Sequence, residues 1–209
     1  MPGPSSRSTG GGLIGTFAAG TLEYTTLTNK SLLDLTWVGP IEEAAKLIVP
    51  LIVFFLVRDR FQTEMDGLLF GVATGMTFAA LETMGYELVA LVGSRGSLAV
   101  LNQTILIRGL LSPAGHAAWT GMVTATLWRE RQRTGRSFTP VVFGFFLLAA
   151  ALHSLWDYAS ASSNLFIVVP SYLAIGGVSL FLLFWRLKEA RRQSKDKIKK
   201  VSEHEGMKR

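Results

Sequence analysis

Hydrophobic residues in this chain are gathered into long blocks. Five blocks reach the roughly 20 residues that a helix needs to cross the apolar core of a bilayer. They span residues 38–57, 67–92, 105–128, 138–158 and 165–185. A sixth, weaker block at 11–27 contains Glu23 and several threonines, so we expect a short or re-entrant helix there. The pattern predicts an all-α fold: a polytopic transmembrane bundle of five to six membrane helices.

Composition indicates one membrane domain with short flanking segments. The 209 residues are 49% hydrophobic and only 17% charged, whereas roughly a quarter of a typical soluble domain is charged. We expect residues 1–12, rich in Gly, Ser and Pro, to be disordered. Residues 13–186 would then form a single transmembrane domain, followed by a basic tail at 187–209. The absence of cysteine excludes disulfides and cysteine-ligated zinc.

Basic residues are concentrated in alternate connections between the blocks. Residues 58–60 carry two arginines, residues 129–136 carry four, and residues 186–209 carry ten Lys or Arg. The intervening connections carry Arg95 or no basic residue. By the positive-inside rule, the Arg-rich connections and the C-terminus face the cytoplasm. We therefore expect a multi-pass protein embedded in the lipid bilayer, with a cytoplasmic C-terminus and without a nucleic-acid partner.

Ionisable residues within or beside the apolar blocks are candidates for chemistry, because charge is costly there. The candidate catalytic residues are Glu42, Glu43, His116 and His153, and the candidate supporting residues are Lys46, Glu82, Arg108 and Asp157. With the orientation above and a rise of about 1.5 Å per residue, these side chains fall in the outer half of the bilayer. We therefore expect residues from separate blocks to meet in one layer.

The first block opens with two carboxylates and a lysine, Glu42-Glu43-x-x-Lys46. One interpretation is structural: the carboxylates complement the dipole at the head of a helix, and Lys46 neutralises them one turn later. The other makes one carboxylate a general base for water, with its neighbour and Lys46 holding its geometry. The two glutamates lie about 100° apart around a helix, and the spacing alone does not choose between them.

Two later blocks each carry a polar group that needs a partner. Glu82, in Phe78-x-x-x-Glu82, lies in a helix rich in Gly and Ala. Its carboxylate either pairs with a basic group in a structural role or takes part in the chemistry. His116 follows Pro113, which we expect to kink its helix. A membrane histidine can also be only a hydrogen-bond partner between helices. Arg108, just upstream, is expected at the outer interface or paired with a carboxylate.

The fourth block ends in His153-Ser154-Leu155-Trp156-Asp157. The i, i+4 spacing places His153 and Asp157 on one helix face, where the carboxylate can fix the tautomer of the imidazole. The structural alternative is a capped helix end with Trp156 in the aromatic belt of the membrane.

In this order, the motifs resemble the PrsW family of intramembrane proteases, and more distantly the superfamily of type II CAAX prenyl endopeptidases and bacteriocin-processing proteins. The family pattern is EExxK, then FxxxE, then a histidine in a following helix, then HxxxD. The matching residues are Glu42-Glu43-x-x-Lys46, Phe78-x-x-x-Glu82, His116 and His153-x-x-x-Asp157. Each motif is weak alone, but four in order on separate blocks are fairly specific.

The resemblance implies an endopeptidase of a bacterial or archaeal cell membrane. It would cut single-span, membrane-tethered proteins, such as anti-sigma factors, on the extracytoplasmic side. Under a glutamic mechanism, which we favour, Glu42 or Glu43 activates water without a cofactor, and His153 and Asp157 stabilise the oxyanion. Under a metal mechanism, zinc or another divalent ion would be bound and a second glutamate would be the base. Its ligands would be His116, His153 and either Glu82 or Glu43.

Two other classes of function stay open at this point. Buried carboxylates also serve proton-coupled transporters, although the chain shows no internal repeat. A catalytically inactive membrane scaffold is the third hypothesis. Convergence of the candidate side chains within hydrogen-bond reach favours the enzyme, and their separation favours the scaffold.

Overall fold

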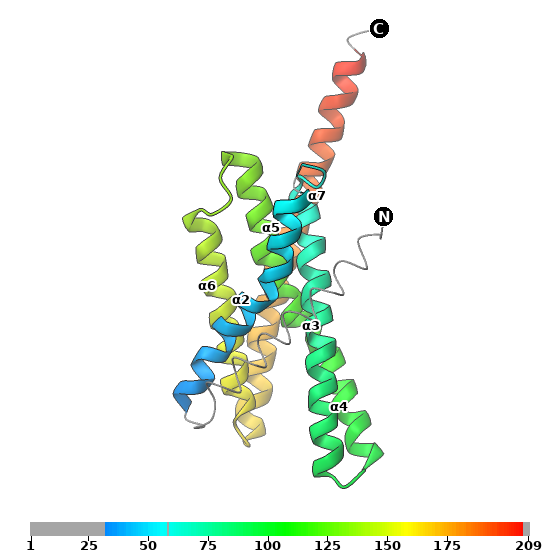
Figure 1. Ribbon diagram of the computed structural model, residues 1–209, viewed down its shortest axis with the longest axis vertical. Coiled ribbons are helices and arrows are strands. Elements are labelled where there is room, and N and C mark those ends of the chain that lie inside the picture. Colours follow the sequence, from blue (N-terminus) through cyan, green and yellow to red (C-terminus); the bar gives the residue numbers. More distant parts are fainter. Residues whose placement is uncertain (1–31, 58, 207–209) are drawn as a thin grey trace.

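The structure is a computed structural model that describes residues 32–57 and 59–206 (Figure 1). Its helices are α2 (Leu32–Val57), α3 (Glu64–Gly93), α4 (Leu98–Leu111), the short 3-10 helix η1 (Ser112–Ala114), α5 (His116–Thr134), α6 (Pro140–Ser160) and α7 (Leu165–Gly206). The described residues contain no strand, so the predicted all-α bundle is confirmed. The predictions for residues 1–12 and 11–27 lie outside the described residues.

Three of the described helices are long and apolar enough to cross a bilayer: α3, α6 and the Leu165–Asp196 part of α7. Helices α2 and α5, which the sequence predicted as spans, are not among them. The apolar run of α2 is interrupted by Glu42, Glu43 and Lys46. Helix α5 contains three buried threonines and ends in an Arg-rich turn. These two helices therefore contribute much of the polar interior of the membrane bundle.

The prediction of one helix at 105–128, kinked at Pro113, is wrong in its extent, because the chain breaks there into α4, η1 and α5. Pro113 lies in η1 and has no N–H to donate, so an α-helical hydrogen-bond ladder cannot pass through it. Before the break, a turn at Arg95 and Gly96, both with positive φ, folds α4 back along α3. The α3–α4 hairpin extends beyond the rest of the bundle (Figure 1). His116 is consequently the first residue of α5.

Glycines allow close approach between the helices that carry the candidate residues. A Cβ atom at Gly71 of α3 would lie 2.7 Å from the carbonyl oxygen of Thr120 on α5. A Cβ atom at Gly39 of α2 would lie 2.6 Å from the carbonyl oxygen of Ala150 on α6. No side chain fits at such distances, and small residues are the usual solution where membrane helices touch. These contacts draw α3 against α5 and α2 against α6.

Helix α7 runs without interruption from the bundle into the predicted basic tail, so residues 187–206 continue the helix (Figure 1). Within the bundle, the buried Arg186 donates to Glu64 Oε1 at 3.3 Å and to Thr126 Oγ1 at 3.0 Å. Its guanidinium also lies over the rings of Phe145 and Trp185, at 4.4 and 4.8 Å from their centroids. We call Arg186 and Glu64 the Arg186 pair.

Candidate active site

The side chain of Lys46 lies at the centre of a buried polar cluster. Its ammonium nitrogen is 2.8 Å from Glu43 Oε1, 3.2 Å from Glu42 Oε2 and 2.7 Å from His116 Nδ1. An ammonium has three N–H donors, so these three contacts can use all of them. His153 Nδ1 lies 3.5 Å from the same nitrogen. We call these five residues the Lys46 cluster.

The glutamates of the cluster do not lie at a helix head. Helix α2 begins at Leu32, almost three turns before Glu42. A helix dipole acts within the first turn, so the interpretation of these carboxylates as helix-head charges is wrong. Both are buried, with side-chain exposures of 6% for Glu42 and 1% for Glu43. Both glutamates precede Lys46 by about one helical turn, so the three side chains lie on the same side of α2.

The imidazole of His153 is held between carboxylates. Its Nδ1 lies 3.0 Å from Glu43 Oε1, and its Nε2 lies 3.5 Å from Glu42 Oε2 and 3.6 Å from Asp157 Oδ2. The indole of Trp119 stacks on the ring, with centroids 4.6 Å apart and an interplanar angle of 28°. Polar contacts at both ring nitrogens and an aromatic contact on one face fix the orientation of this histidine.

His116 is oriented from its other ring nitrogen. Its Nε2 lies 3.0 Å from Glu82 Oε2, which in turn lies 2.9 Å from Arg108 Nη2. Arg108 Nε also donates to Thr83 Oγ1 at 3.1 Å, so the guanidinium is held in place. Because Nδ1 of His116 accepts from Lys46, we assign its proton to Nε2, where it donates to Glu82. The pairing of Arg108 with a carboxylate is thus observed.

All eight candidate residues meet in one connected network. Five form the Lys46 cluster, and the other three, Glu82, Arg108 and Asp157, contact its histidines or each other. Residues from separate blocks thus meet, as the sequence predicted. The structure therefore satisfies the geometric condition that separates the enzyme hypothesis from the scaffold hypothesis.

Sequence reasoning assigned no role to three contributors to this network, although Phe78 is part of a quoted motif. Thr120 Oγ1 donates to Glu43 Oε2 at 3.5 Å, and Trp119 stacks on His153. The ring of Phe78 lies 4.4 Å from the ammonium of Lys46, a cation–π contact. Helical spacing was the available signal. Trp119 and Thr120 follow His116 by one turn, and Phe78 precedes Glu82 by one turn.

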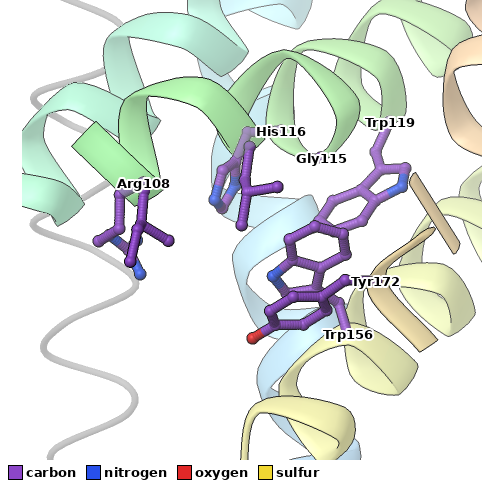
Figure 2. Close-up of a pocket in the computed structure, with 8 residues that line it drawn as sticks. Arg108, Gly115, His116, Trp119, Trp156 and Tyr172 are labelled. Atoms are coloured by element: carbon purple, nitrogen blue, oxygen red, sulfur yellow. The ribbon is translucent and has the colours of Figure 1, made fainter. Parts of the chain in front are cut away.

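A cavity of about 90 Å³ adjoins the cluster at His116. It is lined by Ile107, Arg108, Leu111, Gly115, His116, Trp119, Trp156 and Tyr172. Figure 2 shows Arg108 and His116 across the cavity from the three aromatic side chains, of which Trp156 and Tyr172 stack at 4.1 Å. At about 30 Å³ per water molecule, the space admits a few waters. Hydrolytic water can therefore reach the side of His116.

The donor types of the cluster suit a divalent metal. Glu42, His116 and His153 each offer one ligand atom, and these atoms lie within 4.8 Å of one another. One carboxylate with two imidazoles is a zinc-type set, and Glu82 holds the far nitrogen of His116 as a carboxylate often holds a metal-binding histidine.

The position on which these donors converge is where the ammonium of Lys46 lies. Its nitrogen is 2.7 to 3.5 Å from a donor atom of each of the three residues. A dication about 4 Å from an ammonium is repelled by roughly 8 kcal/mol at an effective dielectric constant of 20. The residues therefore do not fit a metal while Lys46 keeps this position, although their types would allow one.

The fold and the cluster define an integral membrane protein with a buried acid–base site. The chain belongs to the PrsW family, because residues 9–185 match the family described as "PrsW family intramembrane metalloprotease". It is therefore an intramembrane peptidase. Comparisons with curated proteins and with solved structures found no match.

Proposed function

We propose that this peptidase cuts single-span, membrane-tethered proteins with a water molecule activated by Glu42 and without a bound metal. One observation carries the proposal: Glu42, Glu43, His116 and His153 from three helices meet around one ammonium. Lys46 lies within ion-pair distance of both carboxylates in this buried place, so its ammonium offsets one of their two negative charges and makes a buried base less costly.

The contacts of the two glutamates favour different roles. Glu43 Oε1 is engaged by Lys46 and His153, and its Oε2 by Thr120, so its position is fixed from several sides. Glu42 is the more accessible of the two carboxylates, at 6% against 1% side-chain exposure. We assign Glu42 as the general base and Glu43 as a positioning residue that holds Lys46 and His153.

The chemistry then follows from these positions. Glu42 takes a proton from water as the water oxygen attacks the scissile carbonyl carbon, and the same proton passes to the leaving nitrogen as the C–N bond breaks. Nδ1 of His153 faces Glu43, so His153 in its protonated form donates from Nε2, beside Asp157, to the oxyanion that forms on the carbonyl oxygen. Glu82 keeps His116 in the tautomer that accepts from Lys46.

The side of cleavage is also part of the proposal. The connections at 94–97 and 161–164, at the ends of α3 and α6 that follow Glu82 and Asp157, carry only Arg95. The Arg-rich connections lie at the other ends of these helices. By the positive-inside rule, this charge distribution supports a site near the extracytoplasmic face and a cytoplasmic C-terminus.

The test is cleavage of single-span reporter proteins, tagged at both ends, by the full-length chain in liposomes. Glu42→Gln is expected to lower the rate about 100-fold or more, as for loss of a general base. Glu87→Gln, on the same helix as Glu82 but outside the cluster, is the matched control. It should cleave the reporter at nearly the rate of the unchanged protein. An undiminished rate in Glu42→Gln contradicts the assignment, and a cut in the cytoplasmic half contradicts the proposed side.

A further inference from the structure

Lys46 makes the contacts that a metal ion would be expected to make in this cluster. Its ammonium takes up a carboxylate oxygen of Glu42, a carboxylate oxygen of Glu43 and the Nδ1 lone pair of His116. Glu42 and His116, together with His153, are the residues whose ligand atoms could hold a divalent ion, so the ammonium engages electron pairs that the ion would need. A lone pair engaged by an N–H donor is not available to a metal.

We propose that the ammonium of Lys46 is the built-in cation of this site and excludes a divalent metal from it. The inference rests on the proposed function for its role in catalysis, but the occupancy of the site by metal is a separate, measurable property. In this assignment Lys46 is a positioning residue. It holds the two carboxylates and His116 in the places that the reaction needs.

A cation is required here for a physical reason. Glu42 and Glu43 are both buried, and two adjacent carboxylates without a counter-charge repel each other and lose their hydration. A tethered ammonium supplies the counter-charge at all times, whereas a metal would have to enter the bundle and displace it. Chain geometry favours the ammonium, because the i+3 and i+4 spacing on α2 brings Lys46 to both carboxylates.

The surroundings of Lys46 also hold it in place. Its side chain is 0% exposed, and its nitrogen lies 4.4 Å from the centroid of the Phe78 ring. This aromatic contact favours a cation at the position and offers no lone pair for metal coordination. Phe78 precedes Glu82 on α3, so α3 supplies both the ring under the ammonium and the carboxylate that orients His116.

Removal of the ammonium should therefore create a metal site. The full-length chain, Lys46→Ala, and Lys46→Ala combined with His153→Ala are purified, incubated with zinc, dialysed, and measured for bound metal by elemental analysis. We expect well under one zinc per chain for the unchanged protein and about one for Lys46→Ala. The double variant should fall back toward the unchanged protein, because it lacks one of the three ligands.

Cobalt is the second probe, since tetrahedral cobalt absorbs visible light, and Lys46→Arg is the charge-preserving control. Lys46→Arg should stay free of metal. If Lys46→Ala is too unstable to purify alone, purification with zinc is expected to raise its melting temperature and its yield. The unchanged protein gains nothing from zinc in the same assay.

The outcomes separate the inference from the proposed function. An unchanged protein that holds stoichiometric zinc and loses cleavage on chelation overturns the inference and the metal-free mechanism proposed above, and leaves a peptidase. A folded Lys46→Ala that takes up no metal, with or without zinc during purification, also overturns it. An unchanged protein that is free of metal but cuts no reporter sinks the proposed function and leaves the cation assignment standing.

Discussion

The Lys46 cluster and the Arg186 pair are two buried ionic groups in one bundle with opposite characters. Residues of α5 contact both, His116 in the first and Thr126 in the second, about 15 Å apart along the helix. In the Arg186 pair, one guanidinium meets one carboxylate, and aromatic rings lie against the guanidinium. In the Lys46 cluster, one ammonium meets two carboxylates and two imidazoles.

The difference shows that buried charge alone does not identify a site. Arginine stays protonated at any physiological pH, so the Arg186 pair is suited to hold α7 against α3 and α5. Histidine exchanges protons near neutral pH. The Lys46 cluster has two histidines, and one of them, His116, lines a cavity that water can enter. The two imidazoles are acid–base groups that charge pairing between Lys46 and the glutamates does not need. They identify the Lys46 cluster as the reactive one of the two groups.

The largest effect that separates the two groups is expected on stability. Arg186→Ala leaves Glu64 buried without its cation, which costs about 3–5 kcal/mol in the free energy of unfolding. Unfolding in detergent measures the loss, and Lys188→Ala on the exposed side of α7 is the control. Cleavage per folded molecule should be unchanged. A stable but inactive Arg186→Ala would place this pair in the active site.

The next effect is on activity. Glu82→Gln weakens the hydrogen bond that holds the tautomer of His116, a charge-assisted contact worth about 1.5–3 kcal/mol, or roughly 10- to 150-fold in rate. We expect kcat to fall by about this factor, with a smaller change in KM. Reporter kinetics measure both constants. A fall confined to the melting temperature would give Glu82 the structural role that the Arg186 pair has.

A smaller change is expected when both members of the Arg186 pair are replaced. Apolar residues of similar size in place of a buried ion pair are often neutral or stabilising. Arg186→Met with Glu64→Leu should therefore bring the unfolding free energy back to within about 1 kcal/mol of the unchanged protein. Unfolding in detergent is the measurement. If the double variant stays as unstable as Arg186→Ala, the pair has a specific structural role.

The smallest effect compares two threonines on α5. Thr120→Val removes the long hydrogen bond to Glu43, and Thr126→Val removes the bond to Arg186. Such bonds between membrane helices average about 0.6 kcal/mol and reach about 1.7, so changes of a few-fold are expected. Thr120→Val should lower cleavage and Thr126→Val only stability. Equal effects of the two threonine variants on cleavage would contradict the assignment of a catalytic role to the Lys46 cluster and a structural role to the Arg186 pair.

The sequence predicted the helical bundle and the meeting of the candidate residues for one reason. Apolar blocks stand out because the bilayer demands them, and ionisable residues inside such blocks are costly enough to need partners. The i, i+4 pair His153 and Asp157 and the spacing of Glu42 to Lys46 were also readable, because helical periodicity determines which side chains share a face.

Other features depended on information that a hydropathy pattern does not contain. The block at 105–128 is long enough for one membrane helix, so Pro113 predicted only a kink. The sequence did not show that α4 folds back along α3 or that a new helix begins at His116. Glu64 and Arg186 flank their blocks and resemble loop charges in the sequence. Only the packing of α7 against α3 and α5 shows that they are buried together.

The long-range contacts of His153 also determine when the site can exist during synthesis. His153 lies 110 residues after Glu43, so the glutamates leave the ribosome well before their histidine partner. At about 5–20 residues per second, this interval lasts roughly 6 to 20 s. A nascent chain that ends before α6 carries its carboxylates without a complete site. The newly made enzyme is therefore inactive, and neighbouring membrane proteins are exposed to its activity only after α6 has docked.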